Sequence, residues 1–423
     1  MITYLKSTVM LMTIGMLMTP IQPNDYPIDG YETTKIRRLK RLTLVMSGEI
    51  KDTKPPLGGQ LSINDITLNL LGERGDSLDA LPKADPVFQK SINALFPNLD
   101  ESYSIAVLDI TAGKPIRYAG RKEMGRYQPG SVGKLAVLAG FFAELEKIYP
   151  NSFEKRQELM RTKIVQGGKW AMVDEHTVPL FDTLTNKLVK RTVIESDEFT
   201  LYEWLDHMMS VSNNGAASVC WREAILMRVF GKTYPTLTDA MADQFFAVTP
   251  KSELSTLAIS VVNDPLRKLG ITEDEWRLGS LFTRGAGTFI PRSGGSIGTP
   301  SGLMKFLVAM ERGKVIDQES SLEMKRMMYM TDRRIRYASA GVLSKAAVYF
   351  KSGSLYKCKP EEGYSCAKYQ GNVDNFMNSV AIVEHPDGRD YIVVMMSNVL
   401  KKNSASDHAA LAVNIDQVVK NLK

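Results

Sequence analysis

The sequence predicts an α/β fold of the α+β type, in which an antiparallel sheet flanked by helices adjoins an all-helical lobe. Apolar residues recur at helical spacing in residues 135–145, 201–209 and 219–229. The apolar run at residues 346–350 has the length and composition of a buried strand. Two more apolar runs, 380–384 and 392–396, are separated by a Pro-Asp-Gly turn sequence that favours an antiparallel hairpin.

The first 22 residues resemble a secretory signal peptide. Lys6 precedes an apolar run at residues 9–18, which is shorter than the ~20 apolar residues that a transmembrane helix needs. No Ala-x-Ala cleavage site follows, so signal cleavage and retention as an inner-membrane anchor both stay open. We expect the protein in the bacterial envelope, periplasmic or secreted.

Residues 23–85 are expected to form a small β-rich N-terminal extension. Apolar residues alternate with others in residues 42–47 and again in residues 66–70, as they do in a strand. A basic cluster precedes the first alternation, and it forms either a solvated face, the commoner outcome, or a contact with lipid head groups or the cell wall. Its members are Lys35, Arg37, Arg38, Lys40 and Arg41.

Ser131 and Lys134 form a Ser-x-x-Lys motif at the start of a predicted amphipathic helix. Residues three apart on a helix share a face, so the lysine amine can approach the serine hydroxyl. A serine hydroxyl becomes a good nucleophile when a neighbouring base takes its proton, and a lysine with a depressed pKa can do so. Taken alone, such a pair is more often a helix-capping serine beside a solvated lysine.

A second motif, Ser212-Asn213-Asn214, lies on a short loop between two predicted helices. Thr200 and Glu203 have capping-box spacing at the start of the first of these helices. A hydroxyl at position 212 and a carboxamide at 214 can relay a proton and bind a substrate amide. The alternative is that Asn214 only caps the helix that follows.

A third motif, Lys351-Ser352-Gly353-Ser354, ends the predicted strand at 346–350. Glycine in a strand allows a ligand or another backbone to come close, and the lysine can hold a substrate carboxylate. The N–H groups of Ser354 and Ser131 are candidate oxyanion donors. An ordinary strand end with a polar turn has the same composition.

The three motifs occur in the order Ser-x-x-Lys, Ser-x-Asn, Lys-Ser-Gly, and together they resemble class A β-lactamases and penicillin-binding proteins. The resemblance covers residues 86–423. It implies a β-lactamase/transpeptidase-like fold, with one sheet built from both ends of this region. Residues 104–109 and 116–118 resemble the first two strands, Thr299-Pro300 opens an equivalent helix, and a final helix carries residues 411–422.

The resemblance also implies a mechanism for a serine hydrolase that forms an acyl-enzyme. Lys134 deprotonates Ser131, which attacks a β-lactam or a D-Ala-D-Ala-like amide. Ser212 and Lys351 pass a proton to the leaving nitrogen, and the N–H groups of Ser131 and Ser354 stabilise the oxyanion.

Substrate binding is assigned to the remaining motif residues. Asn214 holds the side-chain amide of the substrate, and Lys351 with Ser352 meets its carboxylate beside Gly353. We expect a small-molecule β-lactam or a peptidoglycan peptide as partner, no nucleic acid, no cofactor and no metal. The four histidines lack zinc-ligand spacing with one another or with a cysteine.

One departure from class A β-lactamases concerns deacylation. Their loop between the second and third motifs carries a glutamate that positions the deacylating water, but residues 277–298 contain no acidic residue here. Glu273 and Glu275 lie too early in the chain, where they open a turn or face solvent. A D-Ala-D-Ala carboxypeptidase or penicillin-binding protein therefore stays an alternative, and so does a receptor that is acylated without turnover.

The remaining features are compatible with an exported enzyme. Apolar residues make up 44% of the chain and charged residues 24%, with a net charge of +6, which is ordinary for a globular protein. Cys358 and Cys366 are spaced to form a disulfide in an oxidising compartment, and Cys220 is expected in the core. Residues 173–191 are a candidate inserted hairpin near the site.

Two other site types are excluded by single positions around Ser131. A phosphate-binding loop ending at Lys134 needs glycine at position 128 and serine or threonine at 135, but the chain has Gln128 and Leu135. A nucleophile elbow needs glycine at 129, where the chain has Pro129.

Overall fold

The computed structural model describes residue 28 and residues 30–291, 294–329, 331–332 and 334–422. The expected signal peptide or anchor at residues 1–22 lies outside the described residues. Within the described ranges, no helix combines the length and the apolar character that crossing a membrane requires.

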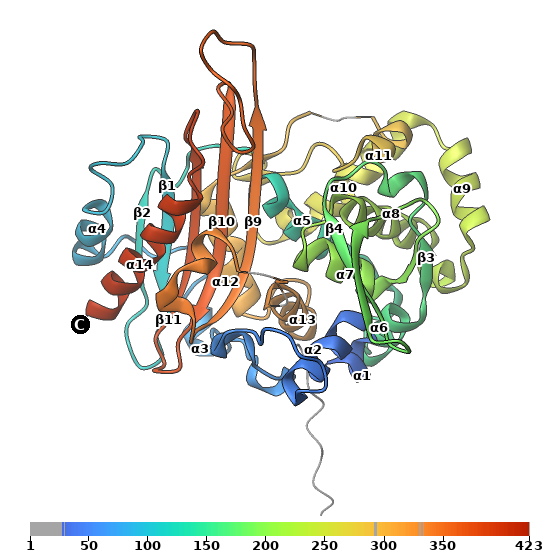
Figure 1. Ribbon diagram of the computed structural model, residues 1–423, viewed down its shortest axis with the longest axis horizontal. Coiled ribbons are helices and arrows are strands. Elements are labelled where there is room, and N and C mark those ends of the chain that lie inside the picture. Colours follow the sequence, from blue (N-terminus) through green and yellow to red (C-terminus); the bar gives the residue numbers. More distant parts are fainter. Residues whose placement is uncertain (1–27, 29, 292–293, 330, 333, 423) are drawn as a thin grey trace, which may run out of the picture.

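A five-stranded antiparallel sheet forms one side of the molecule (Figure 1). Its strand order is β2-β1-β11-β10-β9, and every neighbouring pair is antiparallel. The sheet therefore combines strands from both ends of the region after residue 86, as expected. The strands are β1 (Ser104–Asp109), β2 (Arg117–Arg121), β9 (Ala347–Lys357), β10 (Asp374–Glu384) and β11 (Asp390–Asn398).

Both faces of this sheet are buried. Alternate residues of β1 show this, since Ile105 and Val107 join one apolar core while Ala106 and Leu108 join the other. The first core is closed by α4 (Pro86–Asn93) and α14 (Ala405–Asn421). The second contains α12 (Pro300–Glu311) and α13 (Gln318–Tyr329), and it continues into the helical side of the molecule.

Helices surround α5 on the other side of the molecule (Figure 1). The sequence suggested an amphipathic helix here, but every residue of α5 from Lys134 to Leu145 is buried, because α8 and α10 pack against it. The helices of this side are α5 (Lys134–Ile148), α6 (Phe153–Thr162), α7 (Leu201–Ser210), α8 (Asn214–Phe230), α9 (Asp239–Val248), α10 (Lys251–Lys268) and α11 (Arg284–Phe289).

Three two-stranded sheets complete the helical side. The hairpin predicted at residues 173–191 is present as β4 and β5, which pair from Thr177 with Thr192 to Asp182 with Lys187. The strands are β3 (Ile164–Gln166), β4 (Thr177–Asp182), β5 (Lys187–Thr192), β6 (Glu198–Thr200), β7 (Trp276–Arg277) and β8 (Ile297–Gly298).

The prediction of a β-rich extension at residues 23–85 is wrong for the described part of that segment. Residues 30–85 form α1 (Tyr31–Thr34), α2 (Arg37–Ser47) and α3 (Glu73–Asp76) but no strand. The alternation at residues 42–47 predicted a strand, but the buried positions of α2 are 38, 39, 44 and 45, which is a helical pattern. Ile66, Leu68 and Leu70 are buried alternately, as expected of a strand, but no strand pairs with them.

The basic cluster at residues 35–41 is not wholly a solvated face, because two of its arginines pair with carboxylates of α7. Arg38 forms a buried ion pair with Asp206 of α7 at 2.6 Å, and Arg37 contacts Glu203 at 2.7 Å. Thr200 caps α7 as predicted, but the Glu203 carboxylate binds Arg37 in place of closing the capping box. These contacts fasten the extension to the helix that leads to Ser212, along the lower edge of the view in Figure 1.

Candidate active site

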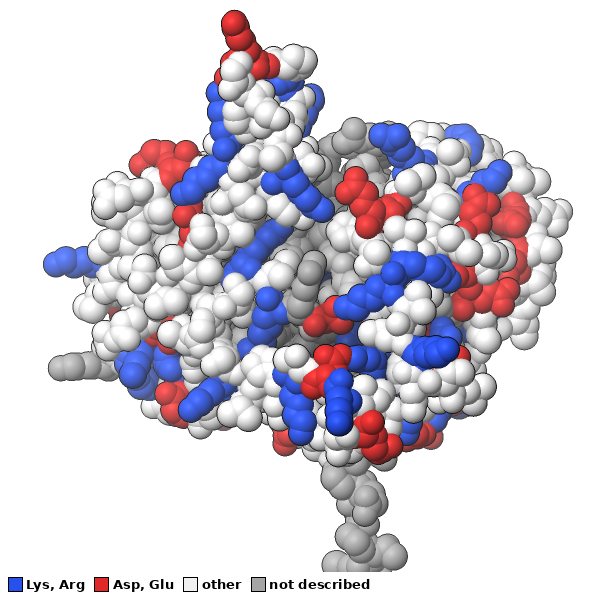
Figure 2. Space-filling model, in the orientation of Figure 1, with Lys and Arg blue, Asp and Glu red and all other residues white. Residues whose placement is uncertain are grey.

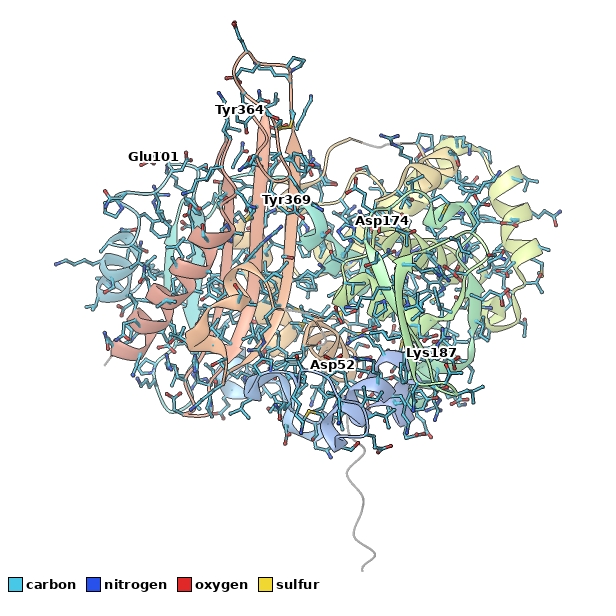
Figure 3. The ribbon with its side chains drawn as sticks, viewed as in Figure 1. Asp52, Glu101, Asp174, Lys187, Tyr364 and Tyr369 are labelled. Atoms are coloured by element: carbon cyan, nitrogen blue, oxygen red, sulfur yellow. A yellow bond between two sulfur atoms is a disulfide. The ribbon has the colours of Figure 1, made fainter. Side chains whose placement is uncertain are left out.

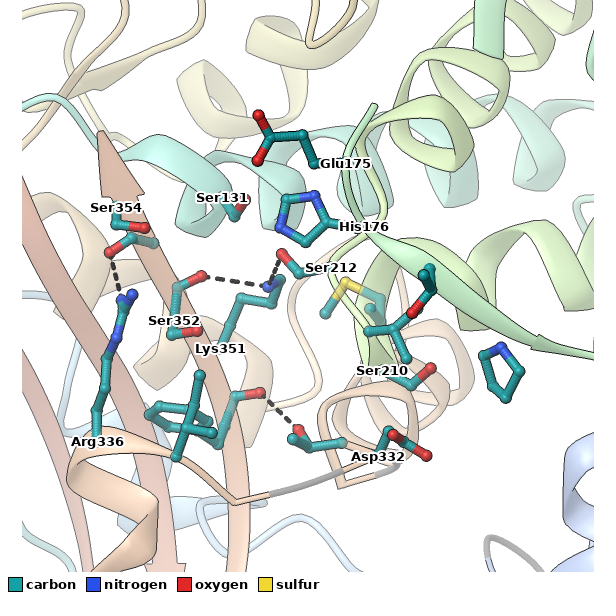
Figure 4. A pocket seen from close by; sticks show the side chains of 18 of the residues that line it. Ser131, Glu175, His176, Ser210, Ser212, Asp332, Arg336, Lys351, Ser352 and Ser354 are labelled. Carbon is teal, nitrogen blue, oxygen red and sulfur yellow. Dashed lines mark hydrogen bonds between the residues drawn. The ribbon is translucent and has the colours of Figure 1, made fainter. Parts of the chain in front are cut away.

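A cavity of about 310 Å³ lies between strand β9 and the β4–β5 hairpin (Figure 4). Most of the predicted site residues line it, and the two that do not, Lys134 and Asn214, are hydrogen-bonded directly behind it. The predicted residues that line it are Ser131, Ser212, Lys351, Ser352, Gly353 and Ser354. The structure thus brings the three sequence motifs together.

Ser131 lies in a short 3-10 helix, Gly130–Gly133, that leads directly into α5. Lys134 is the first residue of α5, and its Nζ is 3.1 Å from Ser131 Oγ. The Lys134 side chain is fully buried. Burial lowers the pKa of the Lys134 amine to about 7, although Asp174 opposes the shift.

The hydrogen bonds of Lys134 orient its lone pair. Its Nζ donates to Asn214 Oδ1 at 2.8 Å and to the Ser212 carbonyl oxygen. A neutral amine has two N–H groups and one lone pair, so these two acceptors leave the lone pair for the Ser131 hydroxyl proton. The arrangement is that of a base poised on a nucleophile.

Ser212 connects the two lysines of the site. Lys351 Nζ donates to Ser212 Oγ at 2.8 Å, and Lys134 Nζ is 3.2 Å from the same oxygen. Ser212 has a φ of 61°, a left-handed conformation that is uncommon for serine and is often found at functional sites. Burial, with the charges of Lys134 and Arg336, holds the pKa of Lys351 well below its usual range.

Asn213, not Asn214, caps helix α8. Its Oδ1 accepts a hydrogen bond from the Ala216 N–H at 2.7 Å. The Asn214 side chain is therefore left to contact Lys134 and Asp174, and Asp174 accepts from the Asn214 backbone N–H at 2.6 Å. The cap that the sequence allowed at position 214 is made one residue earlier.

Gly353 permits the close approach of β9 to the segment that carries Ser131. A Cβ at position 353 would lie 2.1 Å from the Pro129 carbonyl oxygen and 3.0 Å from the Ser131 nitrogen. On the other side of this contact, a Cβ at Gly130 would lie 2.8 Å from the Ser354 nitrogen. Two backbone N–H groups from different elements therefore come together beside the nucleophile, as an oxyanion hole requires.

The cavity carries more positive than negative charge. Figure 2 shows lysine and arginine side chains on both sides of the groove between the sheet and the helices. The lysines and arginine that line the cavity are Lys190, Arg336, Lys351 and Lys368, against Glu175 and Asp332. Such a cavity favours an anionic ligand.

Several lining residues were not anticipated from the sequence. Arg336 is largely buried, donates to the Gly353 carbonyl oxygen at 2.7 Å and stacks over Tyr369 at 5.2 Å. No sequence pattern marks Arg336, because the 3-10 helix that it begins, Arg336–Ser339, is too short to show a periodicity. His176 belongs to the hairpin region that the sequence did place near the site.

The loop that leaves β9 contributes Tyr369 and Lys368 to the cavity. Cys358 and Cys366 are joined by a disulfide in this loop, with a Cα–Cα distance of 6.2 Å. Cys220 is a free, buried cysteine. Figure 3 shows Tyr369 on the sheet side and Asp174 on the helical side of the molecule.

Glu275 has a structural role, so it cannot serve as the missing deacylating acid. It is buried and accepts hydrogen bonds from Lys305 Nζ at 2.6 Å and from the Thr272 N–H at 2.9 Å. These hydrogen bonds outweigh burial and keep the pKa of the Glu275 carboxyl below its usual value. The expectation that this residue opens a turn or faces solvent is wrong, because Glu275 ends a turn and is buried, whereas Glu273 is exposed.

The sequence model of the Beta-lactamase enzyme family matches residues 87–416. The chain belongs to this β-lactamase family. No curated protein matches the chain. The family assignment and the fold therefore agree with the resemblance drawn from the three motifs.

Solved class A and related β-lactamases share the fold of this protein. A class A β-lactamase from Bacteroides cellulosilyticus superposes with a TM-score of 0.50 at 15% identity, over 79% of this chain and 96% of that one. A β-lactamase from Chitinophaga pinensis gives 0.51 at 14% identity, over 79% and 98%. The TLA-3 extended-spectrum β-lactamase gives 0.52 at 14% identity, over 79% and 97%.

Proposed function

We propose that this family member is a serine acyl hydrolase that forms an acyl-enzyme on Ser131 with a β-lactam or a related amide. The observation that carries the proposal is the fully buried Lys134 amine, 3.1 Å from Ser131 Oγ, with its pKa lowered to about 7. At neutral pH a large share of this amine is unprotonated and can accept the serine proton.

Acylation then proceeds through residues of the cavity. Ser131 Oγ attacks the amide carbonyl as its proton passes to Lys134, and the N–H groups of Ser131 and Ser354 bind the oxyanion. The leaving nitrogen takes a proton through Ser212 Oγ, which contacts both Lys134 and Lys351. Breakage of the C–N bond leaves the acyl group on Ser131.

Charge and hydrogen-bonding groups support a carboxylate-bearing amide as substrate. Lys351 and Ser352 on β9, with Arg336 beside them, offer a positive region for the carboxylate that β-lactams and C-terminal peptides carry. Asn214, which the resemblance assigned to the substrate amide, does not line the cavity, because its carboxamide binds Lys134 and Asp174; we therefore assign it to positioning Lys134. The disulfide favours an oxidising compartment, and we propose export to the bacterial envelope.

A second candidate is a penicillin-binding D-Ala-D-Ala carboxypeptidase, or a receptor that is acylated without turnover. The lack of an acidic residue in 277–298 favours these alternatives. Intact-protein mass spectrometry after mixing with a penicillin separates them. Clearance of the adduct within seconds, with drug hydrolysis, supports a β-lactamase; an adduct that lasts for hours supports a penicillin-binding enzyme or receptor. The absence of any adduct contradicts acylation by β-lactams.

A further inference from the structure

A histidine and a buried aspartate form a pair at the mouth of the cavity. Asp174 and His176 precede strand β4, and Asp174 Oδ1 is 2.7 Å from His176 Nδ1. The Asp174 side chain is 4% exposed and that of His176 40%. His176 lines the same cavity as Ser131 and Ser212, as Figure 4 shows.

Both carboxylate oxygens of Asp174 accept hydrogen bonds from neighbouring residues. One carboxylate oxygen accepts from the Asn214 backbone N–H at 2.6 Å, and the other from Asn214 Nδ2 at 3.1 Å. Burial raises the pKa of Asp174, but the hydrogen bond from His176 and the other contacts bring it below its usual value. Asp174 is therefore a carboxylate at neutral pH, and it is too enclosed to activate a substrate water itself.

An ionised Asp174 selects one tautomer of His176. The carboxylate accepts the proton on Nδ1, so the neutral ring carries its lone pair on Nε2. In the described part of the chain, Asp174 is the only hydrogen-bond partner of this ring. Nε2 is thus left to the cavity, where a water molecule can reach it.

We propose that His176, oriented by Asp174, is the general base that activates the deacylating water. This inference rests on the proposed function, because it needs an acyl group on Ser131. The inference places the activation of the deacylating water in the hairpin region. Residues 277–298 offer no carboxylate for this step, and Glu275 is held by Lys305.

The step balances without any further reactant. As the water oxygen bonds to the acyl carbonyl carbon, His176 Nε2 takes one water proton and Asp174 stabilises the imidazolium. The tetrahedral intermediate then collapses, and the bond between the carbonyl carbon and Ser131 Oγ breaks. Ser131 Oγ takes the proton from the imidazolium, directly or through one water, and the free acid leaves.

The chain contains a matched control for this pair. His385 Nε2 lies 2.7 Å from Asp416 Oδ1, but His385 is in the turn between β10 and β11 and does not line the cavity. Replacing His176 or His385 by alanine therefore removes a His–Asp pair in both cases, and only His176→Ala alters the cavity.

The test measures acylation and deacylation separately, by time-resolved intact mass spectrometry of the full chain with a penicillin. We expect His176→Ala to form the adduct and to clear it at least ~100-fold more slowly than wild type, since a general base contributes about 10²–10⁴-fold. Added imidazole should restore part of the clearance in His176→Ala, which a merely structural histidine would not allow. His385→Ala should clear the adduct as wild type does.

Two results would overturn the assignment of His176 while leaving acylation intact. One is equal clearance by wild type and by both His176→Ala and His176→Gln. The other is a wild-type adduct that never clears. A wild-type protein that forms no adduct would instead overturn the proposed function, and the deacylation step with it.

Discussion

Replacing Lys134 by methionine should change how the stability of the protein depends on pH. Burial lowers the pKa of the Lys134 amine from 10.5 to about 7 in the folded protein. Each pH unit between these two values corresponds to about 1.4 kcal/mol, so the buried amine costs up to about 5 kcal/mol of folding free energy relative to an exposed lysine.

The sign of the effect follows from the protons bound in each state. Below pH 7 the folded and unfolded chains both carry the Lys134 proton, so the cost is fully present and constant. Between pH 7 and 10.5 the unfolded chain binds a proton that the folded protein does not. Wild type should therefore gain stability relative to Lys134→Met as the pH rises, by about 1.4 kcal/mol per pH unit.

Urea unfolding of both proteins between pH 6 and 9 measures this difference. Loss of the Lys134 hydrogen bonds to Ser212 and Asn214 changes the unfolding free energy of Lys134→Met by the same amount at every pH. The slope of the stability difference against pH is therefore the readout. Lys134→Met also removes the charge that helps to lower the pKa of Lys351, so the comparison is made with Lys351→Met present in both proteins. A stability difference that is flat between pH 7 and 9 would mean that Lys134 is protonated in the folded protein, and the base assigned to Ser131 would be wrong.

The remaining predictions concern acylation, the oxyanion hole and the extension. The rate of acylation by penicillin in stopped-flow mixing should rise with pH through about 7, because only unprotonated Lys134 accepts the serine proton; a pH-independent rate would contradict this. Gly353→Ala should slow acylation by about 10²–10³-fold, because the new Cβ would force β9 and the Ser354 N–H away from Ser131, which has the effect of losing an oxyanion donor. Gly287→Ala, whose Cβ meets nothing within 4 Å, should leave the rate unchanged. Asp206→Ala should lower the free energy of unfolding by about 3–5 kcal/mol, because it removes one member of the buried ion pair between Arg38 and Asp206; a change below 1 kcal/mol in urea unfolding would show that this pair does not fasten the extension.

The motifs predicted the catalytic cluster because their chemistry depends on local spacing. Ser131 and Lys134 share a helix start, and the Lys351 to Ser354 run lies on one strand. Which residue caps α8 was not predictable, because Asn213 and Asn214 are both good caps and only the contact of Asn214 with Lys134 decides between them.

The sequence was less informative wherever burial depends on distant partners. In the sequence, Arg37 and Arg38 fit a solvated face. Only the structure shows that they pair with Glu203 and Asp206 of α7. Arg336 reaches Gly353 from a four-residue 3-10 helix, which is too short to show a periodicity in the sequence. Alternation at residues 42–47 indicated a strand because a short apolar run fits both periods, and packing selected the helical one.

The central claim is that Ser131 is the nucleophile, and mapping the site of acylation tests it most directly. Wild-type protein and Ser131→Ala would be incubated with a penicillin, digested with protease and analysed by tandem mass spectrometry. We predict a penicilloyl group on the peptide that contains Ser131, and none on the variant. An adduct on another residue, or an equal adduct on Ser131→Ala, would contradict the account.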